Sequence, residues 1–488
     1  MTRASKKLAF IYPPEVPLKN NPSLDVVNDD MGTFPCLSLL YVAALAERQG
    51  HEVSFLDMNA AHLGLEDAVR WVNAEKPDYL LYNMATLSFH EVLGWIRAIK
   101  ERCDVPTIVG GSHLHLYPAE TVSHACIDYA CSGDAETMLS PLLDAIDRGR
   151  DLREVPGLAF TDRKTGEIVL TTKDEKTSFG DRHPWPARHL IDNTLYHSIL
   201  SRRKNYTALF TSRGCPYQCT FCDRTRKIIY YRSPKNVVDE MQECVEEYGI
   251  HEADVFDAVF SLDRDRTVEI CREMIRRKLD LELDVRTRVD HVDPELLDIM
   301  RRAGVRAIYY GVESADPEIL SRLDKKVTLP LIEKSIRDTQ KAGMQVLGFF
   351  MFGGPGETEA SFWRTVEFAK KMDFDYVQLS KFAPFPDSVL YKEWMARHGW
   401  DYWGEYTKDA TKLQVLDPLD TDMTEEQLRR LIKKAYTQFY FRPRYLWKVA
   451  RRTRSLEEIR KGSKTALRML LEGVKVRDFK PQQALGKS

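Results

Sequence analysis

The sequence has few cysteines, no long apolar run and almost no net charge. Nine cysteines in 488 residues are too few for a disulfide scaffold, so any cluster of them indicates a metal site or catalysis. No run reaches the roughly 18 apolar residues of a membrane span, and the basic N-terminus precedes a short apolar run ending in Pro13-Pro14, which is not a signal-peptide pattern. A net charge of −2 excludes a uniformly basic nucleic-acid binder. We expect a cytoplasmic globular protein.

Strands alternate with helices through the first part of the chain. Strands are predicted at five apolar runs, 7–13, 51–58, 78–85, 107–111 and 127–133. Their alternation with segments of helical periodicity is typical of a doubly wound parallel sheet. We therefore predict a Rossmann-like α/β domain over residues 1–150, followed by a hairpin and linker over residues 151–200.

A second series of strands and helices extends from residue 201 to residue 410. Its six predicted strands, one of them at 254–262, fit a partial or full β/α barrel better than a small open sheet. From residue 411 to residue 488 the pattern is helical. The predicted architecture is therefore α/β, with a Rossmann-like domain, a barrel and a helical C-terminal region.

Three of the cysteines lie within eight residues of one another. Cys215, Cys219 and Cys222 form a C-x3-C-x2-C motif directly after the first barrel strand, where barrel enzymes place their active sites. Three thiolates can bind three irons of a [4Fe-4S] cluster and leave the fourth iron open to a ligand. Structural zinc is the alternative, but it needs a fourth ligand, and His197 and His251, the nearest histidines along the chain, lie outside the loop.

The cysteine loop, with Phe221 before its last cysteine, resembles the signature of the radical S-adenosylmethionine (SAM) superfamily. The resemblance implies that the open iron binds the amino and carboxylate groups of SAM. It also implies that an electron from the cluster cleaves SAM to a 5′-deoxyadenosyl radical, which abstracts hydrogen from an unactivated carbon. The protein would hold the reagents in place and exclude water.

Several strand ends downstream resemble the segments that contact SAM in this superfamily. The family pattern Asp-Asp-x-Phe at the end of the second barrel strand is changed here to Asp-Ala-Val-Phe, which retains only the first acid, Asp257. For Arg288 and Glu313 a salt bridge is the alternative interpretation, because charged residues are common at strand ends. The predicted SAM contacts are Phe221, Asp257, Arg286, Arg288, Glu313, Ser314, Gly353 and Gly354.

The first domain resembles the cobalamin-binding domain that precedes the barrel in one branch of the superfamily. The resemblance predicts cobalamin contacts at Thr86, Gly110, Gly111, Ser112, Gly133 and Glu136. The Asp-x-His-x-x-Gly motif that supplies a histidine to cobalt is absent, so cobalamin would bind without that ligand. A generic α/β domain, or one that has lost cobalamin, is the alternative.

The C-terminal segment from Phe441 to Ser488 is basic. It holds fourteen lysines and arginines against four acidic residues, and aromatic residues are interleaved at its start. Contact with an anionic membrane surface is one interpretation, and a solvated helical cap on the barrel is the other. Nucleic acid is the less favoured partner. The near-zero net charge of the chain therefore hides a cationic end.

The predicted function is that of a cobalamin-dependent radical SAM enzyme. Methyl transfer from methylcobalamin to an unactivated carbon is narrowly favoured, and an oxidative cyclase or hydroxylase resembling the anaerobic magnesium-protoporphyrin monomethyl ester cyclase is the alternative. A hypothesis from another class of function is a metal-containing binding protein without catalysis, which would not cleave SAM. The predicted cofactors are a [4Fe-4S] cluster, SAM and cobalamin. The expected partners are a small-molecule substrate, for which the basic, aromatic tail weakly favours a hydrophobic compound, and a reductant of the flavodoxin or ferredoxin type.

Overall fold

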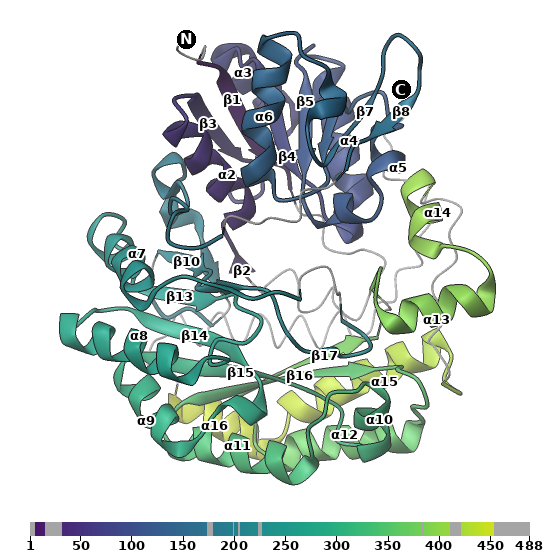
Figure 1. The fold of residues 1–488 in the computed structure, drawn as a ribbon. Helices are drawn as coiled ribbons and strands as arrows, with labels where there is room; N and C mark the ends of the chain where they lie inside the picture. Colours follow the sequence, from purple (N-terminus) through teal and green to yellow (C-terminus); the bar gives the residue numbers. More distant parts are fainter. Residues whose placement is uncertain are drawn as a thin grey trace.

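Two β-sheets, one above the other, organise the molecule (Figure 1). The computed structural model describes residues 5–14, 32–172, 179–198, 200–203, 205–222, 227–382, 385–409 and 421–452. The predicted helical region 411–488 thus lies partly outside the described residues. In Figure 1 the first sheet (purple to blue) lies above the second (teal to green).

The first sheet has seven strands in the order β3-β1-β4-β5-β6-β7-β8. Its first five strands in the chain are parallel, as predicted, while β7 and β8 continue the sheet antiparallel from β6. The predicted hairpin after residue 150 is therefore part of this sheet. The strands are β1 (Lys7–Tyr12), β3 (Glu52–Asp57), β4 (Tyr79–Asn83), β5 (Thr107–Gly110), β6 (Tyr129–Cys131), β7 (Leu158–Thr161) and β8 (Ile168–Leu170).

Helices cover both faces of the first sheet, which is the doubly wound arrangement. One hydrophobic cluster lies under α2 and α6, and another lies under α3, α4 and α5. These helices are α2 (Leu37–Arg48), α3 (Leu65–Glu75), α4 (Phe89–Lys100), α5 (Pro118–Val122) and α6 (Ala135–Asp147). Because parallel strands end at a common edge, the loops after β4, β5 and β6 meet there.

The second sheet has six parallel strands in the order β10-β13-β14-β15-β16-β17. Within the described residues β10 and β17 are its two edges and do not pair, so the barrel is partial. The strands are β10 (Tyr206–Leu209), β13 (Glu252–Val255), β14 (Glu282–Thr287), β15 (Val305–Glu313), β16 (Gln345–Phe352) and β17 (Tyr376–Lys381). Two short pairs, β2 (Gly32–Thr33) with β9 (His197–Ser198) and β11 (Ser212–Arg213) with β12 (Tyr230–Tyr231), flank it.

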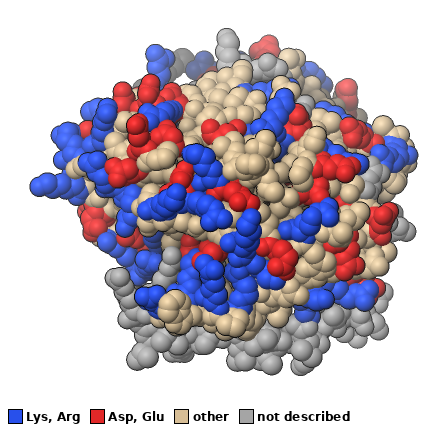
Figure 2. Space-filling model, turned by 90° about the horizontal axis from the view of Figure 1, so that it is seen from below, with Lys and Arg blue, Asp and Glu red and all other residues tan. Residues whose placement is uncertain are grey.

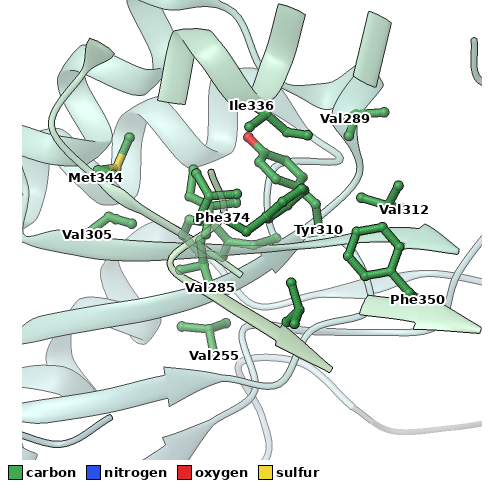
Figure 3. Close-up of a cluster of buried hydrophobic side chains, with 14 of the residues drawn as sticks. Val255, Val285, Val289, Val305, Tyr310, Val312, Ile336, Met344, Phe350 and Phe374 are labelled. Carbon is green, nitrogen blue, oxygen red and sulfur yellow. The ribbon is translucent and has the colours of Figure 1, made fainter. Parts of the chain in front are cut away.

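The convex face of the six-stranded sheet packs on helices and forms the largest core. Alternate strand residues such as Val285, Tyr310 and Phe350 point into this core (Figure 3). The covering helices are α7 (Pro234–Glu246), α8 (Arg264–Arg277), α9 (Pro294–Arg302), α10 (Pro317–Arg322), α11 (Leu329–Lys341), α12 (Glu359–Lys371), α15 (Glu425–Tyr440) and α16 (Pro443–Arg452). The other set of alternate side chains therefore lines the concave face, toward the first domain (Figure 1).

The predicted strand at 254–262 is shorter than expected. β13 ends at Val255, because Asp257 turns aside to bind the end of β10, as described below. The rest of the predicted run is a loop whose apolar residues Val259 and Phe260 are buried. Periodicity alone could not distinguish this buried loop from a strand.

Two helices connect the barrel to the first domain. These are α13 (Val389–His398) and α14 (Tyr402–Lys408), which rise beside the first domain in Figure 1. The phenol of Tyr117 donates to Asp401 at 3.0 Å, and Trp394 and Trp403 are buried in the same cluster as the first-domain helices. The two domains therefore share a hydrophobic core at this point.

Candidate active site

A short hairpin closes the loop that carries the three cysteines. β11 pairs antiparallel with β12, and Gly214 turns the chain into the loop at a φ of +100°. A Cβ at Gly214 would lie 2.1 Å from the carbonyl oxygen of Ile228, so only glycine fits there. Cys215 is half-buried, Cys219 is buried and Cys222 is exposed, and none of the three forms a disulfide.

The three cysteines supply the donor set of a [4Fe-4S] cluster, one thiolate for each of three irons. Among the described residues, no group of three or more His, Cys, Asp or Glu side chains is placed to share one metal ion. Zinc ligands must converge on one point, whereas each thiolate of a [4Fe-4S] cluster binds a different iron. His251 precedes the amino-terminal end of β13, whereas the cysteine loop follows the carboxyl end of the neighbouring strand β10, and the His251 ring lies 3.2 Å from Asp280.

Asp257 anchors the root of the cysteine loop. Its carboxylate is buried and accepts hydrogen bonds from the amides and the hydroxyls of Thr211 and Ser212, with distances of 2.5–3.0 Å. Arg266 also donates to the Thr211 carbonyl at 2.7 Å. The sequence predicted a SAM contact for Asp257, whereas these contacts support a role in positioning the loop.

Replacing Asp257 with alanine should lower the iron content of the protein. Four donors would lose their acceptor, and a buried donor left unsatisfied costs about 1–3 kcal/mol. The measurement is iron per chain after anaerobic reconstitution, with Asp265→Ala, an exposed change on α8, as the matched control. Full iron loading combined with weaker SAM binding would instead return Asp257 to the set of direct SAM contacts.

Arg288 lies against the cysteine loop itself. Its guanidinium lies 3.7 Å from the centre of the Tyr217 ring, between the first two cysteines, and donates to Asp290 at 2.8 and 2.9 Å. The Tyr217 hydroxyl also hydrogen-bonds to His291. Sequence reasoning missed Tyr217 and His291, because their pairing depends on a contact 74 residues apart along the chain.

Arg286 and Ser314 are engaged by protein side chains other than those of the loop. Arg286 forms a bidentate pair with Asp254, and its guanidinium lies 4.4 Å from the ring centre of Phe256 on the concave face. Burial raises the pKa of Asp254 to about 7. Ser314 is fully buried, with its hydroxyl 3.2 Å from that of Thr365 on α12. The structure therefore does not bring these two predicted SAM contacts together.

The glycine segment after β16 is held by an acidic side chain. The amide of Gly353 donates to the carboxylate of Glu357, whose own amide donates to the Gly354 carbonyl at 3.1 Å. Burial raises the pKa of Glu357 to about 8. Its Oε1 is buried and has no partner among the described residues, so it is the polar atom of this segment that a ligand could satisfy.

Glu313 and a residue that sequence reasoning missed, Lys325, form a buried ion pair. The Lys325 Nζ lies 2.6 Å from Glu313 Oε1, and both side chains are less than a tenth exposed. Glu313 adopts a φ of +66°, an uncommon conformation for a residue with a side chain. No sequence signal pointed to Lys325, because it stands in the charged run Asp324-Lys325-Lys326.

The predicted cobalamin contacts of the first domain gather at one edge of its sheet. Thr86, Gly110, Gly111, Ser112 and Gly133 follow three adjacent strands, β4, β5 and β6. Glu136 is in α6, but its side chain lies outside the described residues. A Cβ at Gly111 would lie 2.3 Å from the Met84 carbonyl oxygen, so this glycine is required by the protein itself rather than by a ligand.

Two buried polar atoms at this edge offer contacts to a ligand. His113 Nε2, after β5, and Ser132 Oγ, after β6, have no hydrogen-bond partner among the described residues. The other ring nitrogen of His113 bonds to Thr86 Oγ1 at 3.0 Å, and burial lowers the pKa of His113 to about 3. Buried polar atoms normally find partners, so these two fit an edge that holds a polar ligand such as cobalamin.

The cysteine loop and the first domain are in contact. Phe221 and Met351 pack against a hydrophobic cluster that joins the first-domain helices to Leu323 and Phe382 of the barrel and to α13 and α14. Arg213, directly before Gly214, lies over the rings of Tyr41 on α2 and Phe179 in the linker, 5.0 and 4.3 Å from their centres. These contacts hold the cysteine loop against the first domain.

Two family models match the chain, one in each domain. The model of the radical SAM superfamily matches residues 209–369, which contain the cysteine loop and most of the barrel. The model of the B12 binding domain matches residues 25–143. The fold and the loop define a radical SAM enzyme. The chain belongs to the branch of this superfamily in which a B12-binding domain precedes the barrel.

Known proteins with both kinds of activity considered above are similar to the chain. It is 28% identical to an uncharacterized methyltransferase of Pyrococcus horikoshii, over 85% of this chain and 90% of that one. It is 26% identical to the anaerobic magnesium-protoporphyrin IX monomethyl ester cyclase of Rubrivivax gelatinosus, over 74% and 66%.

A solved structure shares the fold over both domains. It is that of a radical S-adenosylmethionine methyltransferase from Kitasatospora setae, with cobalamin and a [4Fe-4S] cluster bound. The superposition has a TM-score of 0.63 at 22% identity and covers 80% of this chain and 76% of that one.

Proposed function

We propose that the protein is a cobalamin-dependent radical SAM enzyme that transfers a methyl group to an unactivated carbon of a small molecule. The observation that carries the proposal is the contact between the start of the cysteine loop and the B12-binding domain, where Arg213 lies over the ring of Tyr41 on α2 and that of Phe179 in the linker. Two reaction centres held against one substrate gain from proximity and from exclusion of water.

The residues divide among three proposed cofactor sites. Cys215, Cys219 and Cys222 would hold the cluster, which supplies the electron that cleaves SAM. Phe221, Arg288, Glu313 and the Gly353-Gly354 segment would orient SAM, and Asp257 would fix the loop. The proposed cobalamin contacts are Thr86, Gly110, Ser112 and Gly133. His113 Nε2 and Ser132 Oγ, which have no hydrogen-bond partner among the described residues, belong to the same strand ends.

Oxidative cyclisation is the second candidate reaction, and the similarity to the Rubrivivax cyclase favours it. The two reactions differ in the fate of SAM. A methyltransferase converts one SAM to S-adenosylhomocysteine for every methyl group that it delivers, whereas radical formation alone gives 5′-deoxyadenosine and methionine.

The products of SAM distinguish these reactions without knowledge of the substrate. The cluster-loaded protein is incubated anaerobically with cobalamin, SAM and a flavodoxin reductant, and both nucleosides are quantified. We expect 5′-deoxyadenosine together with cobalamin-dependent S-adenosylhomocysteine. Formation of 5′-deoxyadenosine alone would favour the cyclase, and formation of neither would contradict the radical SAM function.

The basic C-terminus is proposed to contact an anionic membrane surface. On α16, Leu446, Trp447 and Val449 are 42–63% exposed, and the Arg451 guanidinium lies 4.4 Å from the Trp447 ring centre. Among the described residues, no helix combines the length and hydropathy needed to cross a bilayer. Figure 2 shows acidic and basic side chains interspersed over the helix-covered face, so attraction would depend on α16 and the basic residues after it, at about 1 kcal/mol per residue near the surface. Residues 453–488 lie outside the described residues.

Sedimentation with vesicles tests this contact. We expect the full chain to bind phosphatidylserine-containing vesicles and to lose most of this binding when Leu446 and Trp447 are both replaced by serine. Phosphatidylcholine vesicles are the control for charge. Equal binding by the double variant would contradict the proposal.

A further inference from the structure

Glu313, one of the proposed SAM contacts, forms an ion pair with Lys325, and Lys325 has no role in the function derived above. The Lys325 side chain is only 6% exposed, and a buried ammonium is costly unless it is paired. The pair is built into the fold, since Gly311 leaves it room: a Cβ there would lie 2.4 Å from Glu313 Oε1 and 2.7 Å from Lys325 Nζ.

The backbone around Lys325 is tied directly to the cysteine loop. The amide of Thr220, next to Cys219, donates to the Leu323 carbonyl at 3.2 Å, and its hydroxyl donates to the Arg322 carbonyl at 3.1 Å. Arg288 donates to the Lys325 carbonyl at 2.9 Å. The end of α10 and the residues after it therefore support the loop at its central cysteine.

The Lys325 ammonium lies next to the cysteine loop. Its Nζ is 6.0 Å from the ring centre of Phe221, the residue between Cys219 and Cys222 in the motif. Together with the backbone contacts of Thr220, this places a buried cation beside the two later cysteines of the loop.

We propose that the Glu313–Lys325 pair sets the reduction potential of the cluster bound by this loop. The proposal rests on the cluster assigned to the three cysteines under the proposed function. Adding an electron makes the cluster more negative, and a fixed cation in a site of low dielectric lowers the cost of that charge. Lys325 thus favours the reduced state that must donate to SAM, while Glu313 holds the ammonium in place and limits its effect.

Opposite shifts of the potential in two variants test this role. The midpoint potential is measured by redox titration of the cluster, followed by electron paramagnetic resonance, on the reconstituted full chain without substrate. We expect Lys325→Met to lower the potential and Glu313→Gln to raise it, with Lys325→Arg near the wild type. The exposed Lys326→Met is the matched control and should leave the potential unchanged.

The outcomes separate this inference from the proposed function. If Lys325→Met does not load a cluster, Glu313→Gln and Lys325→Arg decide together: the first should raise the potential, and the second, which keeps the cation, should leave it near the wild type. Unchanged potentials in the loaded variants, or shifts in the same direction, would overturn the role of the pair and leave the cluster assignment intact. A wild-type protein that binds no cluster would overturn the proposed function itself.

Discussion

Replacing Cys219 with alanine should abolish both the brown cluster chromophore and the formation of 5′-deoxyadenosine. Cys219 is the buried member of the three cysteines, and the next residue, Thr220, is hydrogen-bonded to the carbonyls of Leu323 and Arg322. With only two thiolates left, the loop cannot bind three irons of the cluster. The measurements are iron per chain, the visible spectrum and 5′-deoxyadenosine after reduction, and we expect activity to fall below detection.

A second cysteine provides the matched control for this change. Cys126 lies in the first domain and is half-buried, so Cys126→Ala removes a thiol without touching the loop. It should keep the iron content and the 5′-deoxyadenosine yield of the wild type. Iron retained in Cys219→Ala at the wild-type level would mean that the metal is bound elsewhere.

Replacing Glu240 with glutamine should destabilise the protein by about 3–5 kcal/mol, as expected when a buried ion pair loses one partner. Glu240 on α7 is fully buried and pairs with two arginines, Arg188 of the linker at 2.7 Å and Arg232 after β12. Glutamine keeps the shape but leaves two buried guanidinium groups without a counter-ion. The free energy of unfolding, measured by urea denaturation, should fall accordingly.

An exposed ion pair is the control for the Glu240 change. Asp280 pairs with Arg203 at 2.8 Å, and its side chain is 62% exposed. Such pairs contribute about 0–1 kcal/mol, so Asp280→Asn should have little effect. A loss from Glu240→Gln as small as that from Asp280→Asn would show that the buried network is not needed to hold the linker between the domains.

Much of the fold could be predicted from the sequence, because both domains repeat one pattern. The apolar runs of the first domain and the β/α alternation after Tyr206 each correspond to a parallel sheet. The cysteine motif could be placed because it directly follows a predicted strand. The alternation of strands and helices does not show whether the first and last strands pair with each other. A partial and a full barrel could therefore be distinguished only from the structure, in which β10 and β17 are the edges of the sheet.

The partners of the site residues could not be predicted, because they come from distant parts of the chain. Asp257 appeared as a ligand at a strand end, but its acceptors are used by Thr211 and Ser212. The sequence predicted that Gly111 lets the backbone approach a ligand closely, whereas in the structure the Met84 carbonyl occupies the space that a side chain at this position would need. Lys325 carried no motif at all. Such contacts follow from tertiary packing rather than from local pattern.

The central claim is that one chain carries a SAM-cleaving cluster next to a cobalamin site, and a single sample can test it. The protein is purified and reconstituted anaerobically with iron, sulfide and cobalamin, and then iron, corrinoid and reduction-dependent 5′-deoxyadenosine are quantified together. We predict about four irons and one corrinoid per chain, with 5′-deoxyadenosine formed from SAM. A colourless or zinc-containing protein that retains no corrinoid and leaves SAM intact would contradict the account.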